Sequence, residues 1–227
     1  MSIRIAAIAL LLIAPSSHAA DGSTAFIRGG LSSVGFKSDA PGARLEADRG
    51  GGLNLSGGLR LDNGFAVRAD FVGSTHDGGT ACISGGGCGS FDDDLELGEG
   101  RLVFLYAPML SDTVGLEVGG GFESVSAEVP SLDYESKSGG LVLEGALVFL
   151  RGDTFRFRLG LALLGLEDDE TNEDVSGGEL SAGFIADVGS VDLGAMIRGL
   201  HLEGDDPDSA ETDVGELRLT IGTTWGL

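Results

Sequence analysis

A period-two alternation is the feature that most constrains this chain. Apolar residues recur at every second position, as at Leu53, Leu55, Leu59 and Leu61, in segment after segment. Successive side chains of a β-strand point to opposite faces, so this period predicts strands with one apolar face. Turn signals such as Asp62-Asn63-Gly64, typical of a tight hairpin, separate the segments. The chain is therefore predicted to be all-β.

Ten strands are predicted, over residues 24–36, 50–61, 65–74, 95–107, 113–125, 140–150, 154–165, 178–188, 191–202 and 214–227. Their connections alternate between short ones, at 62–64, 108–112, 151–153 and 189–190, and long ones, at 37–49, 75–94, 126–139, 166–177 and 203–213. Short turns on one side and long loops on the other are typical of a transmembrane antiparallel up-and-down β-barrel with periplasmic turns. An eight-strand barrel is the alternative, in which 95–107 belongs to a loop.

The distribution of charge favours a membrane barrel over a soluble one. Five apolar-face positions in each strand contain no charged residue, although 22% of the chain is charged. The opposite face carries at least one charge in every strand. A soluble barrel would turn that charged face outward. A lipid-facing surface instead excludes Arg and Lys, which cost about 2–4 kcal/mol each near the bilayer midplane.

Aromatic residues are predicted to mark the two membrane interfaces. The turn-end group is Phe65, Tyr106, Phe149, Phe155 and Trp225, and the loop-end group is Phe36, Phe71, Phe122 and Phe184. Phe26 is the exception, because its position in the alternation places it inside the barrel.

Residues 1–19 are predicted to be a cleaved signal peptide, which leaves 20–227 as the barrel domain. A short start containing Arg4 precedes an apolar run from Ile5 to Ala14, and the small residues Ser17 and Ala19 suit a signal peptidase. No later apolar run is long enough for a spanning helix.

These features together resemble the small outer-membrane β-barrel proteins of Gram-negative bacteria. The alternating C-terminal segment Leu217–Leu227 resembles their last strand, although members commonly end in an aromatic residue and here Trp225 stands two positions earlier. The resemblance implies the cell outer membrane, contact with its lipids and lipopolysaccharide, and insertion by the outer-membrane assembly machinery. We expect a monomer. The net charge of −22 argues against nucleic acid as a partner.

The inward face predicts a network of ion pairs in the lumen. Its arginines are Arg28, Arg60, Arg68, Arg101, Arg156, Arg158, Arg198 and Arg218, and its acids are Asp70, Glu99, Glu117, Glu144, Glu179, Asp187, Asp192 and Glu216. Arg forms planar bidentate pairs with carboxylates, and a barrel of about ten strands encloses little space. We therefore expect a largely plugged lumen and a non-enzymatic barrel with a structural or surface-interaction role. A narrow porin-like channel for small solutes is the alternative.

Two cysteines in one predicted loop, Cys82 and Cys88, are expected to form a disulfide, because the compartment is oxidising and they lie close in sequence. No cofactor or metal site is predicted. Acid runs in three loops (Asp92-Asp93-Asp94, Glu167-Asp168-Asp169-Glu170 and Asp205-Asp206) leave weak Ca²⁺ binding open, although none has the spacing of an ordered calcium loop.

Two histidines are predicted at the outer rim, where an outer-membrane hydrolase would need them. His76 precedes Asp77, and His201 lies near Glu203. Each is a single His in a polar loop, with no nucleophile at a telling spacing. The chain is therefore predicted not to be an enzyme, and an outer-rim hydrolase is the third candidate.

Overall fold

The computed structural model describes residues 22–129, 134–152, 154–169, 173–205 and 210–227. Its strands are β1 (Thr24–Ala40), β2 (Ala43–Arg60), β3 (Phe65–Ile83), β4 (Gly87–Tyr106), β5 (Met109–Ser111), β6 (Val114–Val129), β7 (Tyr134–Arg151), β8 (Phe155–Asp168), β9 (Asp174–Val188), β10 (Val191–Gly204) and β11 (Glu211–Gly226). The described residues contain no helix long and apolar enough to cross a membrane. The predicted signal peptide lies outside the described residues.

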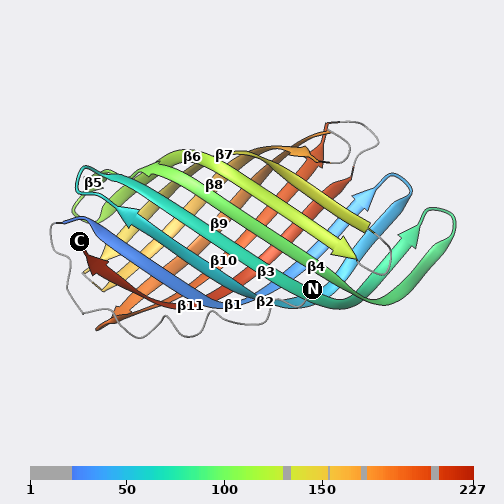
Figure 1. Ribbon diagram of the computed structural model, residues 1–227, viewed down its shortest axis with the longest axis horizontal. Helices are drawn as coiled ribbons and strands as arrows, with labels where there is room; N and C mark the ends of the chain where they lie inside the picture. The colour runs from blue at the N-terminus through green and yellow to red at the C-terminus, as the bar shows by residue number, and fades with distance from the viewer. Residues whose placement is uncertain (1–21, 130–133, 153, 170–172, 206–209) are drawn as a thin grey trace.

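The strands form one closed antiparallel barrel (Figure 1). Each long strand pairs with its neighbours in sequence, β1 pairs with β11, and β4 pairs with β6 from Glu96↔Glu128 to Tyr106↔Val118. Closure matters because a spanning sheet must satisfy every backbone polar group internally. Ten long strands make the wall, so the predicted count is confirmed and the eight-strand alternative is wrong. The short β5 interrupts the connection predicted at 108–112.

The predicted long loops are wrong. Most of 37–49, 75–94, 126–139, 166–177 and 203–213 continues the β-ladders, so the strands run well beyond their predicted ends. The reason is that alternation persists in these segments, but with the polar side chains on the outward face. Charge that indicates a loop in the sequence therefore belongs here to the outer surface of a strand.

The short turns follow from local chemistry. At the β2–β3 turn the Leu61 N–H donates to the Phe65 carbonyl at 2.8 Å, and the Phe65 N–H donates to the Asn63 side chain at 3.1 Å. Gly64 has a φ of 84°, a left-handed conformation that glycine adopts without a Cβ clash. The turn sets the register of both strands.

The membrane half of the barrel is apolar outside and charged inside. We define it as the part of each strand nearer the short turns. Outward side chains such as Leu161, Leu163 and Leu180 are 54%, 60% and 72% exposed. Because they alternate with buried charged residues such as Glu179, the outward face of this half is apolar and its charges lie within the lumen, which is the polarity typical of a wall that faces lipid.

The outer half has the opposite polarity. It comprises residues 33–40, 43–51, 73–83, 87–98, 124–129, 134–140, 164–168, 174–178, 199–204 and 211–215. On β10, Leu200 and Leu202 are buried inside while His201 and Glu203 are exposed outside. Inward apolar residues of this half include Val34, Phe36, Ala47, Leu95, Val129, Leu164 and Leu166, all buried. This is the pattern of a soluble β-barrel, whereas the other half of the same strands has the pattern of a membrane barrel.

Two of the predicted interface aromatics are misplaced. Phe36 has the inward parity of Phe26 and is buried with Ala47 and Leu95 in the outer half. Phe184 stacks on Phe155 with ring centroids 5.7 Å apart, which places it with the turn-end group because β9 ends at Val188.

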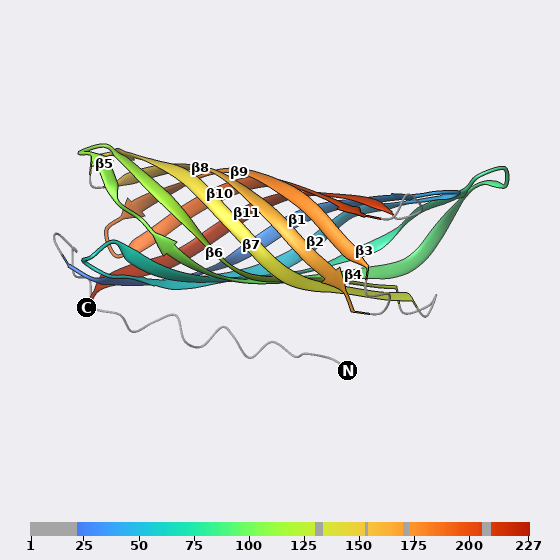
Figure 2. The same cartoon turned by 90° about the horizontal axis from the view of Figure 1, so that it is seen from above.

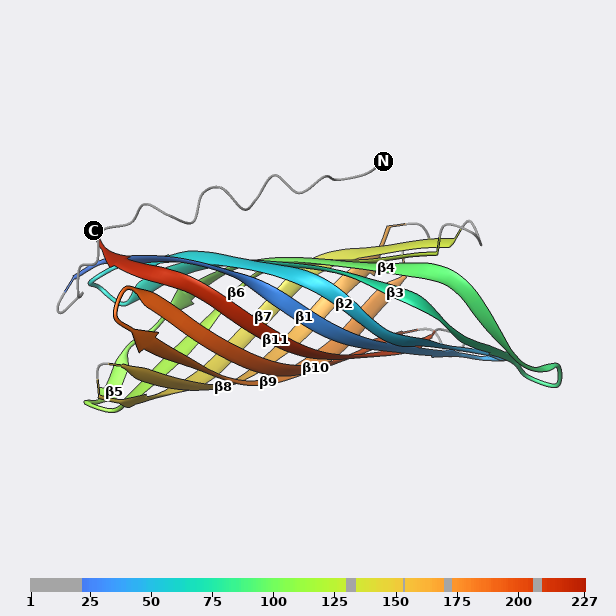
Figure 3. The same cartoon turned by 90° about the horizontal axis from the view of Figure 1, so that it is seen from below.

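The β3–β4 hairpin extends further than its neighbours at the outer end, as Figures 2 and 3 show. Cys82 and Cys88 face each other across its ladder and form the predicted disulfide. The bond therefore joins two paired strands of a hairpin rather than closing an irregular loop.

Candidate functional site

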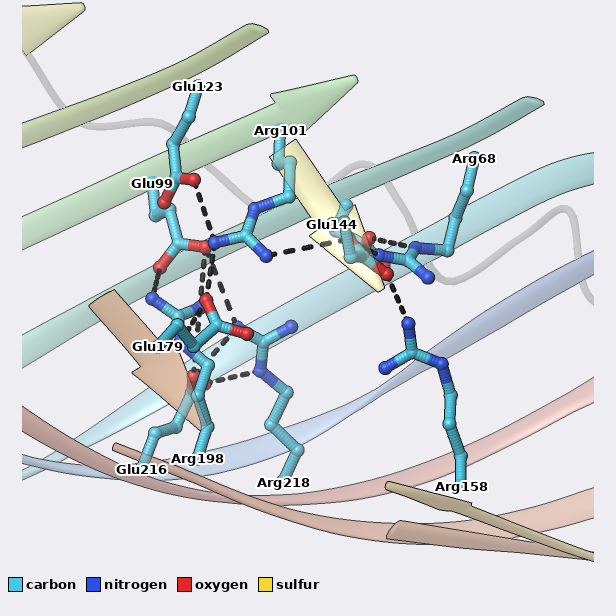
Figure 4. Close-up of polar contacts among 11 residues, drawn as sticks. Arg68, Glu99, Arg101, Glu123, Glu144, Arg158, Glu179, Arg198, Glu216 and Arg218 are labelled. Atoms are coloured by element: carbon cyan, nitrogen blue, oxygen red, sulfur yellow. Dashed lines mark hydrogen bonds and ion pairs between the residues drawn. The ribbon is translucent and has the colours of Figure 1, made fainter. Parts of the chain in front are cut away.

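A group of buried ion pairs crosses the lumen, and we call it the ion-pair belt. It consists of Arg68, Asp70, Glu99, Arg101, Glu117, Glu123, Glu144, Arg158, Glu179, Arg198, Glu216 and Arg218. Every long strand except β1 and β2 contributes to it. Figure 4 shows side chains from opposite walls meeting near the barrel axis.

Arg101 joins distant walls of the barrel. Its guanidinium, 5% exposed as a side chain, lies 2.7 Å from Glu123 of β6 and also pairs with Glu179 of β9. It lies 3.8 Å from Glu144 of β7. Contacts across the axis between strands so far apart in the sheet leave little free width at this level.

Glu144 is a second junction. It accepts a hydrogen bond from Arg68 at 2.7 Å and another from Arg158. These two arginines are completed by Asp70 at 2.6 Å and Glu117 at 2.9 Å. One carboxylate is thus held by three arginines, counting Arg101, which suits an ionised group removed from bulk water.

A third junction lies at β10 and β11. Arg198 pairs with Glu99 at 2.5 Å and with Glu179 at 3.3 Å. Arg218 binds Glu216 through two nitrogen–oxygen hydrogen bonds of 2.6 and 2.7 Å. The bidentate geometry is one that Lys could not provide.

The belt includes most of the predicted lumen residues, but not all. Arg28 and Asp192 pair separately at 2.6 Å, nearer the turn end, where Arg28 also lies 4.4 Å from the ring centre of Phe26. Arg60 donates to the Ala107 carbonyl at 2.9 Å. Within the described residues, Arg60, Arg156 and Asp187 do not join the belt.

Glu123 belongs to the belt but is not among the acids that the sequence predicts for the lumen. Its side chain is fully buried against Arg101. Glu123 lies six positions after Glu117 on β6, so both side chains fall on the same face of the strand. The alternation alone is therefore sufficient to place Glu123 inside.

Cavities lie on both sides of the belt. The turn-side cavity has a volume of about 280 Å³ and the outer cavity about 250 Å³. Glu99 is the one described residue that lines both, so the belt is thinnest there.

The two histidines lie apart and in different surroundings. His76 is not in a rim loop: it is fully buried within β3, and its Nδ1 donates to the Asp48 carbonyl at 2.6 Å. His201 does lie at the outer end, on the outward face of β10, where its Nδ1 donates to Asp213 at 2.8 Å. That hydrogen bond raises the pKa of His201 above its ordinary value.

Metal chemistry receives no support from the described ranges, in which no three His, Cys, Asp or Glu side chains are arranged to hold an ion. The side chains of Asp92 and Asp93, and residues 170 and 206–209, lie outside the described part. Weak Ca²⁺ binding at the acid runs therefore stays a prediction.

Comparison with known proteins finds resemblance in structure alone. No known protein family and no curated protein sequence matches the chain. The outer-membrane protease OmpT of Escherichia coli superposes with a TM-score of 0.59 at 11% identity, over 91% of this chain and 97% of OmpT. The β-domain of the Bordetella autotransporter BrkA superposes with a TM-score of 0.52 at 12% identity, over 90% of this chain and all of that domain.

The chain has the fold of a small outer-membrane β-barrel. At these identities the likeness carries the fold alone, because unrelated activities share such barrels. The architecture expected from the sequence is confirmed.

Proposed function

We propose that this protein is a non-enzymatic barrel of the Gram-negative outer membrane, with a lumen closed at its centre and a structural or surface-interaction role. The observation that carries this proposal is the ion-pair belt. Its side chains come from eight of the ten long strands and meet across the axis (Figure 4). An ion crossing the belt would have to separate buried pairs, which leaves charges uncompensated.

The membrane location is part of this proposal. It is supported by the apolar outward face of the membrane half and by the fold. Contact with outer-membrane lipids and lipopolysaccharide, insertion by the assembly machinery, cleavage of the signal peptide and a monomeric state are proposed with it.

A narrow channel is the second candidate, and one observation favours it. Glu99 lines both cavities, so a small rearrangement of Glu99 and Arg198 would join them. The belt would then act as a gate rather than as a plug.

A hydrolase is supported less well. The buried His76 is enclosed in the wall, with Asp48 and Ser74 as the partners of its ring nitrogens. The exposed pair of His201 and Asp213 faces away from the lumen. Both cysteines are joined in the disulfide and so offer no thiol nucleophile.

The test is single-channel conductance in planar bilayers. The unmodified protein should give no steady openings. A Glu99→Ala/Arg198→Ala variant, which removes the pair where the cavities come closest, should give defined openings. The matched control is Asp39→Ala/Arg44→Ala, a pair on the outer surface that should leave the bilayer silent. Steady openings of the unmodified protein would favour the channel, and a silent Glu99→Ala/Arg198→Ala barrel would show that the belt is not what closes the lumen.

A further inference from the structure

The outer cavity is a hollow with apolar walls. Its volume is about 250 Å³, and its apolar lining includes Phe36, Leu97, Val175, Leu200, Leu202 and Val214. The lining side chains come from strands all around the barrel. A cavity of this kind, with apolar walls and a few polar groups, is the usual form of a small-molecule site.

The polar lining of this cavity has hydroxyl groups, and its charged side chains are all acidic among the described residues. It contains four carboxylates (Glu99, Asp168, Glu173 and Glu216) and, among the described residues, no Arg or Lys. The turn-side cavity differs, since eight arginines and four carboxylates line it. The belt thus separates an acidic, apolar cavity from an arginine-rich one.

The carboxylates lie at two levels. Glu99 and Glu216 form the floor, where they pair with Arg198 and Arg218 of the belt. Asp168 ends β8 and accepts a hydrogen bond from Ser136 at 3.4 Å, near the outer end of the barrel. A molecule inside therefore has apolar walls on its sides and carboxylates below and above.

Three classes of ligand fit this lining poorly. An anion would meet carboxylates and, among the described lining residues, no arginine or lysine to pair with. A metal ion needs several oxygen ligands in one place, whereas the four carboxylates lie at two levels, and no three acidic side chains of the described residues are arranged to hold an ion. A neutral apolar molecule would fit the walls but gain nothing from the acids.

We propose that the outer cavity binds a small apolar compound that carries one positive charge, such as an aromatic amine. The apolar part contacts the walls formed by Val175, Leu200 and Leu202, and the cationic group lies near Asp168 and Glu173. This inference goes beyond the proposed function, because it assigns a ligand class to the outer half. It does not depend on whether the belt conducts.

The test is calorimetric titration of the protein in lipid nanodiscs, with empty nanodiscs subtracted. The probes are phenethylammonium, the neutral 2-phenylethanol and the anionic 3-phenylpropionate, which share a phenyl ring and differ in charge. Phenethylammonium should bind at least tenfold more tightly than 2-phenylethanol, and 3-phenylpropionate should show no binding. Equal heats for all three probes, or tighter binding of the anion, would overturn the proposal.

Two variants locate the binding. Val175→Trp should fill the cavity and abolish binding of phenethylammonium. Asp168→Asn/Glu173→Gln should weaken phenethylammonium about tenfold and leave 2-phenylethanol unchanged. The control is Glu203→Gln, on the outward face of β10, which should change neither.

Each variant is first checked for the heat-dependent gel mobility of a folded barrel. Folded Val175→Trp that still binds the amine would exclude this cavity as the site. Since binding is measured without any current, its failure is distinguishable from a failure of the closed-lumen proposal.

Discussion

The membrane half and the outer half of this barrel obey opposite rules although the same ten strands build both. On β8, in the membrane half, Leu161 faces outward and Arg158 inward. In the outer half of the same strand, Glu167 faces outward and Leu166 inward. On this strand the alternation does not break between them. What changes is the polarity of the outward face, so one strand suits lipid over part of its length and water over the rest.

The difference also accounts for the two ways in which the lumen is filled. In the membrane half the inward face must hold the charges, and these are stable only as satisfied pairs. In the outer half the inward face can be apolar, because the charges are solvated outside. The belt marks the level at which the two arrangements meet.

Breaking the belt should have the largest effect on stability. Arg101→Ala leaves Glu123 and Glu179 buried without their shared partner, which should cost about 3–5 kcal/mol of unfolding free energy. Arg44→Ala, on the outer surface, should cost about 0–1 kcal/mol. Urea unfolding of both variants from lipid vesicles measures this. Equal midpoints would mean that the lumen is wet and its charges individually solvated.

Removing an apolar side chain from inside the outer half should have a smaller effect. Leu200→Ala deletes a buried side chain and should cost about 2 kcal/mol, at the low end for such a change because it borders an existing cavity. Glu203→Ala, three positions along the same strand and facing outward, should be close to neutral. If the two variants unfold alike, the outer half does not have the interior of a soluble barrel.

The disulfide should affect only the protruding hairpin. Cys82→Ser/Cys88→Ser should still assemble and keep its heat-dependent gel mobility, because the bond lies beyond the closed wall. Protease added to whole cells should cut residues 75–94 faster, since the hairpin then opens more often. Unchanged cleavage would mean that the backbone pairing of β3 with β2 and β4 protects the hairpin without the bond. Failed assembly would place the bond on the folding route.

The smallest effect concerns the pH response of His201. Its hydrogen bond to Asp213 raises the pKa of His201 in the folded protein. The stabilisation that the pair contributes is therefore fully present below the ordinary pKa of His and is lost as pH rises through the pKa of the folded state. NMR titration of the His201 ring should show the raised pKa. In Asp213→Asn it should return toward the ordinary value, and an unchanged titration would show that the pair does not form in solution.

The membrane half was largely predictable from sequence, because an uncharged face opposite a charged one, repeated in every strand, is typical of a wall that faces lipid. The outer half was not. On β10 the outward series runs Leu193, Ala195, Ile197, Gly199, His201, so the apolar series ends where the inward Leu200 and Leu202 begin. A strand predicted from a single apolar face therefore ends at this position, and the residues that follow are predicted to be a loop.

The partners within the belt were also beyond reach from sequence. Parity places Arg101 and Glu179 on the inward face, but they meet across the axis from β4 and β9. That contact depends on the tilt and stagger of the strands in the closed barrel, and neither can be predicted from the alternation within one strand. Glu123 and Phe36 are different, because parity alone was enough to place them.

The level of the polarity switch can be measured directly with lipid quenchers. Trp225 is the only Trp of the chain, so a Trp225→Phe background allows single reporters at Leu161→Trp and Glu167→Trp, both outward on β8. In bilayers with brominated acyl chains, fluorescence at position 161 should be strongly quenched and that at 167 should be nearly unaffected. Equal quenching at the two positions would contradict the division of this barrel into a membrane half and a water-exposed outer half.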